Sequence, residues 1–235
     1  MSAPHPTDSG RQSRQKTVGE ALRQDTRDRL LQAAAEEFSV RGYAGTTVTR
    51  LAATAGVSVQ TLYLAWGSKR ALLRAYMESA LSGGAGSPED ADRRFAGLPA
   101  RERLAELATL VTEVAERAAT GWSLYRDTSA VDPEIAADWN QLQLLRYRLI
   151  SGVLGDIPLS ALTEGLTIKS AVDTAWTIAS PESYDLIVRR LGYQLEEFHD
   201  WMRQNLITAI LAPSSSPGSP QQWTGCRLGL FAFAQ

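Results

Sequence analysis

The 235-residue sequence lacks the patterns that mark several classes of protein. It has one cysteine, Cys226, which excludes an intramolecular disulfide framework, and two histidines, His5 and His199, without a paired metal-ligand motif. No apolar run is long enough to cross a bilayer, and residues 1–17 contain no apolar segment of the kind found in signal peptides. We therefore expect a cytoplasmic protein that needs no metal or cofactor and has no membrane partner.

Catalytic motifs are missing as well. The sequence has no glycine-rich phosphate loop, and no nucleophile stands at a usual spacing from a base. The polar cluster of Glu196, Glu197 and His199 is typical of a solvated helix face. Hydrophobic residues make up 44% of the chain and charged residues 21%, which is enough apolar area for a globular core. We expect no enzyme and no catalytic residues, and keep a helical enzyme only as an alternative.

The charges divide unevenly along the chain, whose net charge is -2. Residues 26–77 hold seven basic and three acidic side chains, a net charge of +4. Residues 1–25 add +1, so residues 78–235 carry -7. A basic N-terminal part on an acidic body is the asymmetry expected of a protein in which only one part contacts phosphate groups.

Short helices are expected to follow one another in the N-terminal part. Residues 1–25 show no hydrophobic period and predict a flexible arm, which either stays solvated or reaches a DNA minor groove. A helix is expected over residues 26–40, where apolar side chains recur every three or four residues and a glycine follows. Thr47 and Ser58 are good N-caps for two further short helices, and a fourth helix is expected over residues 68–81.

Residues 47–63 fit a helix, a tight turn at Gly56 and a second helix, the arrangement of a DNA-reading helix-turn-helix. Gly56 permits the sharp turn, while Ala52 and Val57 let the two helices approach closely. The exposed face of the second helix would then enter the major groove. The same spacing also fits an ordinary corner between two helices of a bundle, so the geometry alone leaves both interpretations open.

Long amphipathic helices are expected in the rest of the folded chain. After a Gly/Ser-rich break at residues 82–87, Pro99 suits a first helical turn, and apolar residues follow at helical spacing. No strand-like alternation interrupts them, which predicts an all-α fold with an N-terminal three-helix helix-turn-helix domain and a larger helical domain. Further helices are expected over residues 133–154, 167–179, 181–191 and 195–211. The four expected parts of the chain are an arm, a helix-turn-helix domain, a helical domain and a tail, at residues 1–25, 26–73, 74–212 and 213–235.

A series of short motifs follows a specific order along the chain. They are Gly42-Tyr43, Thr46-Thr47-Val48, Leu51-Ala52, Ala55-Gly56-Val57-Ser58, Thr61-Leu62-Tyr63, Lys69 and Ala71-Leu72-Leu73. They resemble the N-terminal DNA-binding domain of TetR-type repressors. A fainter resemblance to the regulatory half of such repressors covers residues 171–211, through Trp176, Ser180-Pro181-Glu182, Tyr184, Leu191-Gly192-Tyr193 and Trp201. The chain therefore looks like a TetR-family transcriptional regulator.

The resemblance implies a division between phosphate and base contacts. It implies that phosphates are contacted by Thr47, Tyr63 and Lys69. It implies that bases are contacted by Thr49, Ser58, Val59, Gln60 and Thr61. Hydroxyl, phenol and ammonium groups suit phosphate, and the Gln60 amide can bond bidentately to adenine. Thr47 and Ser58 can also be plain helix caps, which is compatible with contacting DNA, and Tyr63 can be half-buried packing. Relatives have an aromatic-His-Phe ending where this chain has Leu64-Ala65-Trp66, so any contact made there is in doubt.

The resemblance also implies a small-molecule pocket and a dimer interface within residues 74–212. Large aromatic residues line such pockets or fill ordinary cores, and the candidates are Trp122, Tyr125, Trp139, Tyr147 and Trp176. No charge pattern selects the ligand. Residues 167–179 and 195–211 are the candidates for a four-helix bundle between two copies of the chain.

Together these features predict a homodimeric repressor that binds double-stranded, palindromic operator DNA and leaves it when a small-molecule effector binds. One recognition helix reads only a few base pairs, which favours two-fold pairing. A helical scaffold that binds only protein would explain the long helices but not the basic helix-turn-helix. The scaffold and the helical enzyme remain the alternatives to DNA binding.

Overall fold

The structure, a computed structural model, describes residues 8–85 and 93–213. Helices joined by turns and short loops make up these two ranges, in which no strand forms and one isolated β-bridge pairs Leu162 with Leu211. The expected all-α fold is confirmed. None of the helices described is long and apolar enough to span a bilayer. His5, Cys226, the tail from residue 214 and the end of the expected Gly/Ser-rich break lie outside the described residues.

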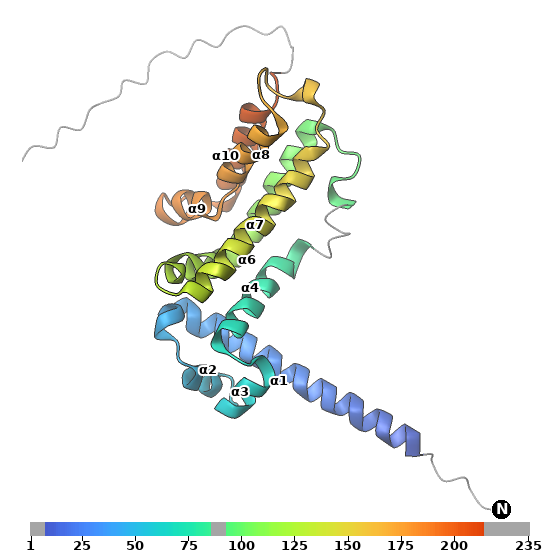
Figure 1. The fold of residues 1–235 in the computed structure, drawn as a ribbon, viewed down its shortest axis with the longest axis vertical. Helices are drawn as coiled ribbons and strands as arrows, with labels where there is room; N and C mark the ends of the chain where they lie inside the picture. The colour runs from blue at the N-terminus through green and yellow to red at the C-terminus, as the bar shows by residue number, and fades with distance from the viewer. Residues whose placement is uncertain (1–7, 86–92, 214–235) are drawn as a thin grey trace, which may run out of the picture.

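Residues 8–85 form the N-terminal head, with α1 (Asp8–Gly45), α2 (Val48–Thr54), α3 (Val59–Trp66) and α4 (Lys69–Ala85). Residues 93–213 form the body, with α6 (Ala100–Ser129), α7 (Pro133–Gly155), the 3-10 turn η1 (Leu159–Ala161), α8 (Ile168–Ile178), α9 (Pro181–Tyr184), the π-helical turn η2 (Asp185–Arg190) and α10 (Leu195–Ile210). Figure 1 shows an elongated molecule with α2 and α3 near one end and α8 and α10 near the other. Helices α4, α6 and α7 connect the two ends.

The start of α1 corrects the expected flexible arm over residues 1–25, because the helix already begins at Asp8. Most residues from Glu20 to Arg29 are exposed, so this part of the helix leaves no hydrophobic period in the sequence. Its side chains instead pair one turn apart. Gln24 Nε2 donates to Asp28 Oδ1 at 2.8 Å, and Arg29 Nε lies 3.1 Å from Asp25 Oδ2. Such pairs support an exposed helix without a core.

The apolar face predicted for α1 packs into the core of the head. Leu30, Ala33, Ala34 and Phe38 are all buried, and they meet buried leucines of the other three head helices, Leu51, Leu62, Leu72 and Leu73. The helix breaks at Gly42, whose φ of 67° lies in the left-handed region that favours glycine. The predicted end of the core-facing helix is therefore confirmed.

The two predicted N-caps are also confirmed. Thr47 Oγ1 accepts a hydrogen bond from Arg50 N at 3.2 Å, and Ser58 Oγ accepts one from Thr61 N at 3.0 Å. Gly56 has a φ of 65° and makes the tight turn between α2 and α3. Val57 N donates to Ala52 O at 2.9 Å across this turn, which fixes the angle between the two helices.

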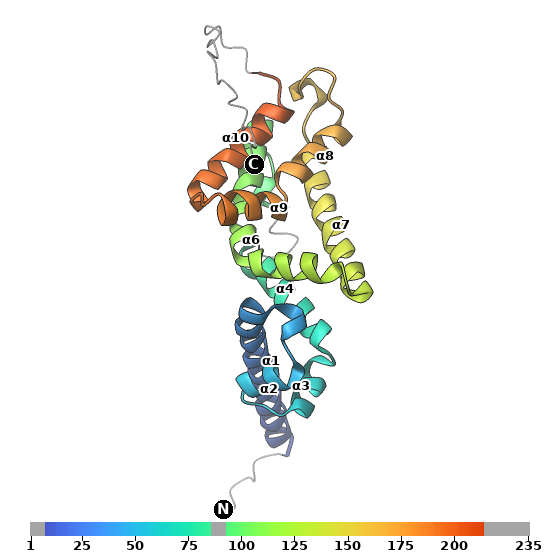
Figure 2. The same cartoon turned by 90° about the vertical axis from the view of Figure 1, so that its left-hand side faces the viewer.

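The body is a bundle built around α6, which packs against α4, α7 and α10 (Figure 2). The helices expected from Pro133, Thr167 and Leu195 are found within a residue or two of their predicted bounds. Pro99 lies just before α6 rather than inside its first turn, and the helix expected over residues 181–191 is divided into α9 and η2. The expected break at residues 82–87 begins later, because α4 continues to Ala85.

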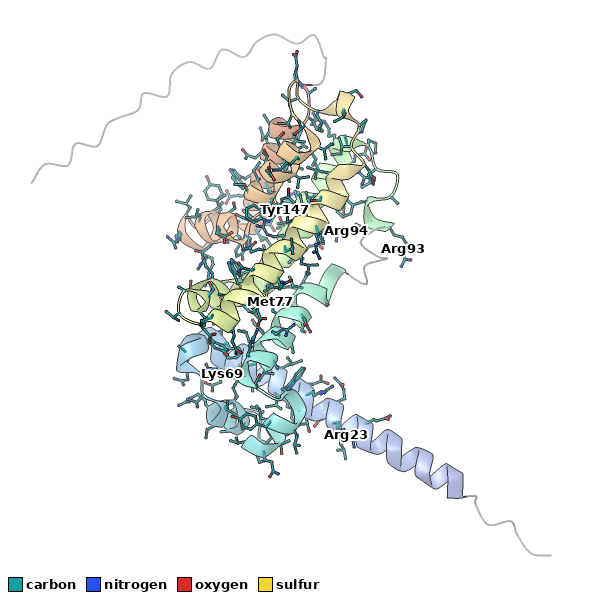
Figure 3. All side chains as sticks on the ribbon, in the orientation of Figure 1. Arg23, Lys69, Met77, Arg93, Arg94 and Tyr147 are labelled. Atoms are coloured by element: carbon teal, nitrogen blue, oxygen red, sulfur yellow. The ribbon has the colours of Figure 1, made fainter. Side chains whose placement is uncertain are left out.

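The head and the body share buried residues at one junction. The core of the head therefore extends beyond residue 73, the expected end of the helix-turn-helix domain. Met77 of α4, Trp122 and Tyr125 of α6, and Ile135 of α7 are buried together with the head residues. An ideal Cβ on Gly121 would lie 2.6 Å from Met77 Sδ, so α4 and α6 approach closely because a glycine stands there. Figure 3 places Met77 at this junction.

We predict that Phe38→Ala lowers the free energy of unfolding by about 3–5 kcal/mol, because it removes a side chain that is only 1% exposed and leaves a cavity. Val40→Ala on the same helix is the control, since Val40 is 75% exposed and its loss should cost less than about 0.5 kcal/mol. Urea unfolding followed by circular dichroism measures both. Equal effects would contradict the packing of α1.

Candidate nucleic-acid interface and apolar cavity

The predicted base-contacting residues share the outer surface of α2 and α3. Thr49, Ser58, Val59 and Gln60 are exposed, and Thr61 is half-buried. The opposite face of α3 carries Leu62, which is fully buried in the head. Helix α3 therefore has one face fixed in the core and one polar face available to a partner, as a recognition helix requires.

The predicted phosphate contacts differ in accessibility. Tyr63 is 50% exposed and Thr47 is exposed beside its capping bond. A hydroxyl that accepts a capping bond can still donate one, so capping leaves Thr47 able to meet an anion. The Ser58 hydroxyl is closer to saturation, because it also lies 2.8 Å from Thr61 Oγ1.

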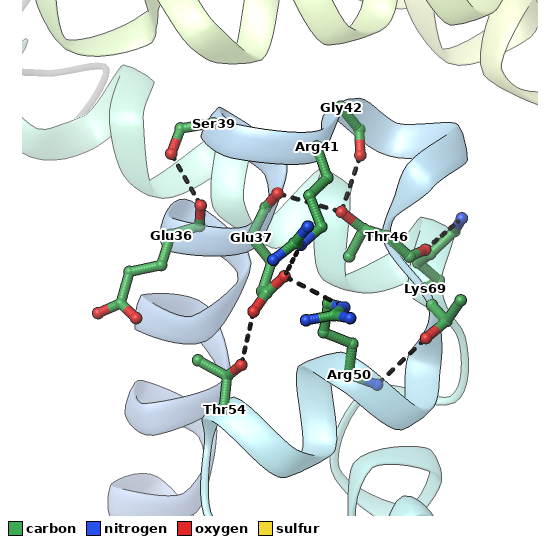
Figure 4. Close-up of polar contacts among 10 residues, drawn as sticks. Glu36, Glu37, Ser39, Arg41, Gly42, Thr46, Arg50, Thr54 and Lys69 are labelled. Atoms are coloured by element: carbon green, nitrogen blue, oxygen red, sulfur yellow. Dashed lines mark hydrogen bonds and ion pairs between the residues drawn. The ribbon is translucent and has the colours of Figure 1, made fainter.

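Lys69 points into the head rather than away from it. Its Nζ donates to Tyr43 O at 2.9 Å and lies 4.0 Å from the centre of the Tyr43 ring. It also donates to Thr46 O at 3.0 Å (Figure 4). Partial burial lowers the pKa of this ammonium. Two of its three donors thus hold the carbonyls that follow the kink in α1, a role that the sequence motif did not reveal.

Glu37 of α1 holds α2 through polar contacts, and the sequence analysis did not select it. Thr54 Oγ1 donates to Glu37 Oε1 at 2.8 Å, Arg41 Nε donates to Oε2 at 2.9 Å, and Arg50 Nε lies 3.8 Å from Oε2 (Figure 4). The hydrogen bond from Thr54, followed by the nearby arginines, holds the pKa of Glu37 below its usual range. Glu37 and Arg41 stand one helical turn apart, which is the only sequence signal of this cluster.

Leu64 is a second residue that the sequence analysis did not select. It is 81% exposed on α3, one turn after Gln60, and an exposed leucine on this helix suits contact with thymine methyl groups. The neighbouring Trp66 is partly buried in the head core, as expected for the position of the family's phenylalanine. The Arg27 guanidinium lies 5.3 Å from the centre of its ring.

The body contains a cavity of about 160 Å³ between α6, α7 and the link from α8 to α9. Its walls are largely aliphatic, with Leu110, Val111 and Val114 from α6 and Leu142 and Leu145 from α7. The last turns of α4 reach it through Leu81. Arg146 is the single charged residue among the described residues of its walls.

Of the five aromatic residues predicted to bind a ligand, Trp122 lines this cavity. Tyr125 borders a separate hollow of about 260 Å³ between α4, α6 and α7, and burial raises the pKa of its phenol. Trp139 packs edge-on against Trp122, with ring centres 5.7 Å apart. Tyr147 packs against Trp176 and donates to Asp173 Oδ1 at 3.0 Å. Trp139, Tyr147 and Trp176 are thus outside the cavity walls, because their rings fill space between helices.

An ion pair joins the head to the body beside the second hollow, which Asp138 lines. Arg70 of α4 donates from Nε to Asp138 Oδ2 at 2.7 Å and from Nη2 to Oδ1 at 2.8 Å, and its Nη1 lies 3.2 Å from Glu134 Oε2. Asp138 and Glu134 both belong to α7. The hydrogen bonds from Arg70 hold the pKa of Asp138 below its usual range. This bidentate pair fixes α4 against α7.

Comparisons with known proteins agree with this architecture. Residues 30–76 match the family model described as bacterial regulatory proteins, tetR family. No curated protein sequence matches the chain. The solved structures that are similar include a putative TetR-family regulator from Rhodococcus sp., with 19% identity, a TM-score of 0.61 and coverage of 78% of this chain and 98% of that one.

Two further similar structures belong to proteins described as a repressor and a transcriptional regulator. NalD, the secondary repressor of the MexAB-OprM multidrug efflux pump in Pseudomonas aeruginosa, has 17% identity and a TM-score of 0.62 over 80% of this chain and 98% of its own. The regulator FadR from Bacillus subtilis, in complex with stearoyl-CoA, has 19% identity and a TM-score of 0.58 over 77% of this chain and 98% of its own.

The class of protein follows from the fold and the family match. The described residues have an all-α architecture, with a helix-turn-helix head on a larger helical body, and this fold is shared with the similar solved structures. Residues 30–76 match the model of the tetR family of bacterial regulatory proteins, which confirms the resemblance found in the sequence. That family consists of regulatory proteins, not enzymes.

We predict that Asp138→Asn lowers the melting temperature at pH 7, because the Asp138 carboxylate loses its charge-assisted bonds to Arg70. The lowered pKa means that this stabilisation is present above the usual Asp range and is lost as the carboxylate is protonated. The difference from the native protein should therefore shrink between about pH 5 and pH 3. Asp127→Asn, on an exposed part of α6, is the control. A difference independent of pH would argue against the ion pair.

Proposed function

We propose that this chain is a ligand-controlled repressor that binds palindromic operator DNA through α3. The observation that carries the proposal is the two-sided α3 helix, with Leu62 buried in the head and Gln60 on an exposed polar face. The basic charge of the head supports it, since residues 26–77 carry +4 on a chain of net charge -2. The similar fold of NalD, which is a repressor, supports repression rather than activation.

In this proposal, Gln60 is the main base-reading residue, because its amide can pair with the N6 and N7 atoms of adenine. Val59 and Leu64 supply apolar contacts to thymine methyl groups, and the remaining base-facing residues are Thr49, Ser58 and Thr61. Thr47 and Tyr63 contact phosphates. Lys69 adds its charge near the start of α4 while it holds the carbonyls of Tyr43 and Thr46.

A homodimer is proposed because two recognition helices are needed to read two half-sites. Helices α8 and α10 are the proposed interface. They contact each other and lie at the end of the body away from α2 and α3 (Figures 1 and 2). Ile168 and Ile178 of α8 and Trp201 of α10 are only partly buried in one copy, which leaves apolar area for a second copy.

The effector is proposed to act through α4. This helix begins directly after α3, its first residue Lys69 holds the end of α1, and its second residue Arg70 holds α7. Its far end places Leu81 on the wall of the cavity. A ligand that moves α4 or α7 changes the orientation of the two heads, and it lowers DNA affinity if it prefers an orientation that the operator does not fit.

We predict that Gln60→Ala weakens binding to the preferred operator by about 1–3 kcal/mol and relaxes sequence preference at one base pair per half-site. Tyr63→Phe should weaken binding to all sequences alike, since a phosphate contact carries no sequence information. Selection from randomised DNA, followed by fluorescence anisotropy at several salt concentrations, measures both effects.

Gln141→Ala, at an exposed position of α7, is the matched control and should leave DNA binding unchanged. A native protein that selects no sequence would contradict the proposed function. An unchanged selection profile for Gln60→Ala would contradict the role of Gln60 alone.

A further inference from the structure

The cavity in the body has one polar feature from which the headgroup of its ligand can be inferred. Among the described residues that line it, Arg146 is the only charged one, and the other walls are almost entirely apolar. An apolar wall accepts the apolar part of a ligand without selecting its headgroup, whereas a charge on the wall discriminates strongly between headgroups. The surroundings of Arg146 therefore decide which ligands the cavity favours.

Three other partly or fully buried arginines of the described residues are paired with carboxylates. Arg70 is paired with Asp138, Arg94 with Glu113, and Arg103 with Asp156. Among the residues that the structure describes, no Asp or Glu forms an ion pair with Arg146. The half-buried Arg146 cation thus has no carboxylate counter-ion among these residues, which favours an anion beside it.

The hydrogen bonds of Arg146 go to neutral acceptors. Nη1 donates to Trp176 O at 2.6 Å and to Ala179 O at 3.2 Å, while Nε and Nη2 donate to Gln143 Oε1 at 3.2 and 3.0 Å. The guanidinium also lies 4.5 Å from the centre of the Trp176 ring. These bonds orient the group and use four of its five N–H donors, which leaves one N–H of Nη2 for another acceptor.

The charge persists at neutral pH despite burial. Loss of water lowers the pKa of Arg146 to about 10, and the more distant Glu182 opposes this only in part. Arg146 is therefore a cation at pH 7 on the wall of an apolar cavity.

The size of the cavity limits the apolar part of the ligand. A dry cavity of about 150 Å³ lined by apolar side chains is known to accept benzene. The cavity here measures about 160 Å³ and is lined by similar side chains, such as Leu110, Val114 and Leu142. One aromatic ring, or an aliphatic chain of similar volume, matches this space.

We infer that the cavity binds small organic monocarboxylates, with the carboxylate on Arg146 and a single apolar ring or short chain between α6 and α7. This inference names the ligand class of the site proposed above and rests on that proposed function for its regulatory meaning. Binding to the free protein can be measured whether or not the ligand changes operator affinity.

The test compares three probes of nearly equal size and different charge, namely benzoate, benzamide and benzylamine, by isothermal titration calorimetry on the full chain at pH 7. Benzoate should bind at least about tenfold more tightly than benzamide, because it gains a charge-assisted bond to the guanidinium. Benzylamine should bind most weakly, since its ammonium meets a like charge.

Variants then locate the site. Arg146→Gln should reduce benzoate affinity to that of benzamide and leave benzamide affinity unchanged. Arg148→Gln, at an exposed position of the same helix, is the matched control and should preserve the preference for benzoate. Val111→Phe should abolish binding of both probes by filling the cavity from α6, without touching the bonds that Arg146 makes to α8.

The inference is overturned if the native protein does not bind benzoate, if benzamide or benzylamine binds as tightly, or if Arg146→Gln keeps the preference for benzoate. Titration of the operator complex with benzoate separates this inference from the proposed function. Selective benzoate binding without any effect on operator affinity would support the ligand class and contradict regulation through this cavity. The comparison of headgroups on the native protein stands even if Arg146→Gln fails to fold.

Discussion

The bidentate pair between Arg70 and Asp138 is the polar contact that holds the helix-turn-helix head to α7 of the body. Arg70 follows Lys69, which holds the carbonyls after the kink in α1, so the start of α4 is attached to both parts of the molecule. Further along α7, Arg146 borders the cavity and holds the end of α8. Helices α4 and α7 thus each contact the junction and the cavity. A change in one place has a direct physical route to the other.

Much of the helical framework could be predicted because its signals are local. The caps at Thr47 and Ser58 and the turn at Gly56 act on atoms only a few residues away, so the sequence alone reveals them. The apolar spacing from Leu30 to Phe38 reflects one helix facing one core. The helix before residue 26 was missed because its described side chains from Glu20 to Asp25 are exposed, and hydrophobic periodicity reports burial rather than helicity.

The functional sites were harder to predict, because their geometry depends on residues far apart in the chain. Arg70 and Asp138 are 68 residues apart, and Arg146 reaches the carbonyl of Trp176 only once α7 and α8 have packed together. Ring size suggested that Trp139 and Trp176 line a pocket, whereas packed rings fill space. The outer face of α3 was better predicted, since the cap and the buried Leu62 fix its orientation.

The central claim is that the junction between α4 and α7 sets the orientation of the head and thereby the affinity for DNA. A double-mutant cycle on operator dissociation constants tests it most directly, with Arg70→Gln, Asp138→Asn and the double variant, each confirmed as folded. We predict that each single substitution weakens operator binding, although neither residue lies on α2 or α3, and that the double variant is no weaker than the worse single variant. Native operator affinity in both folded single variants would contradict the claim.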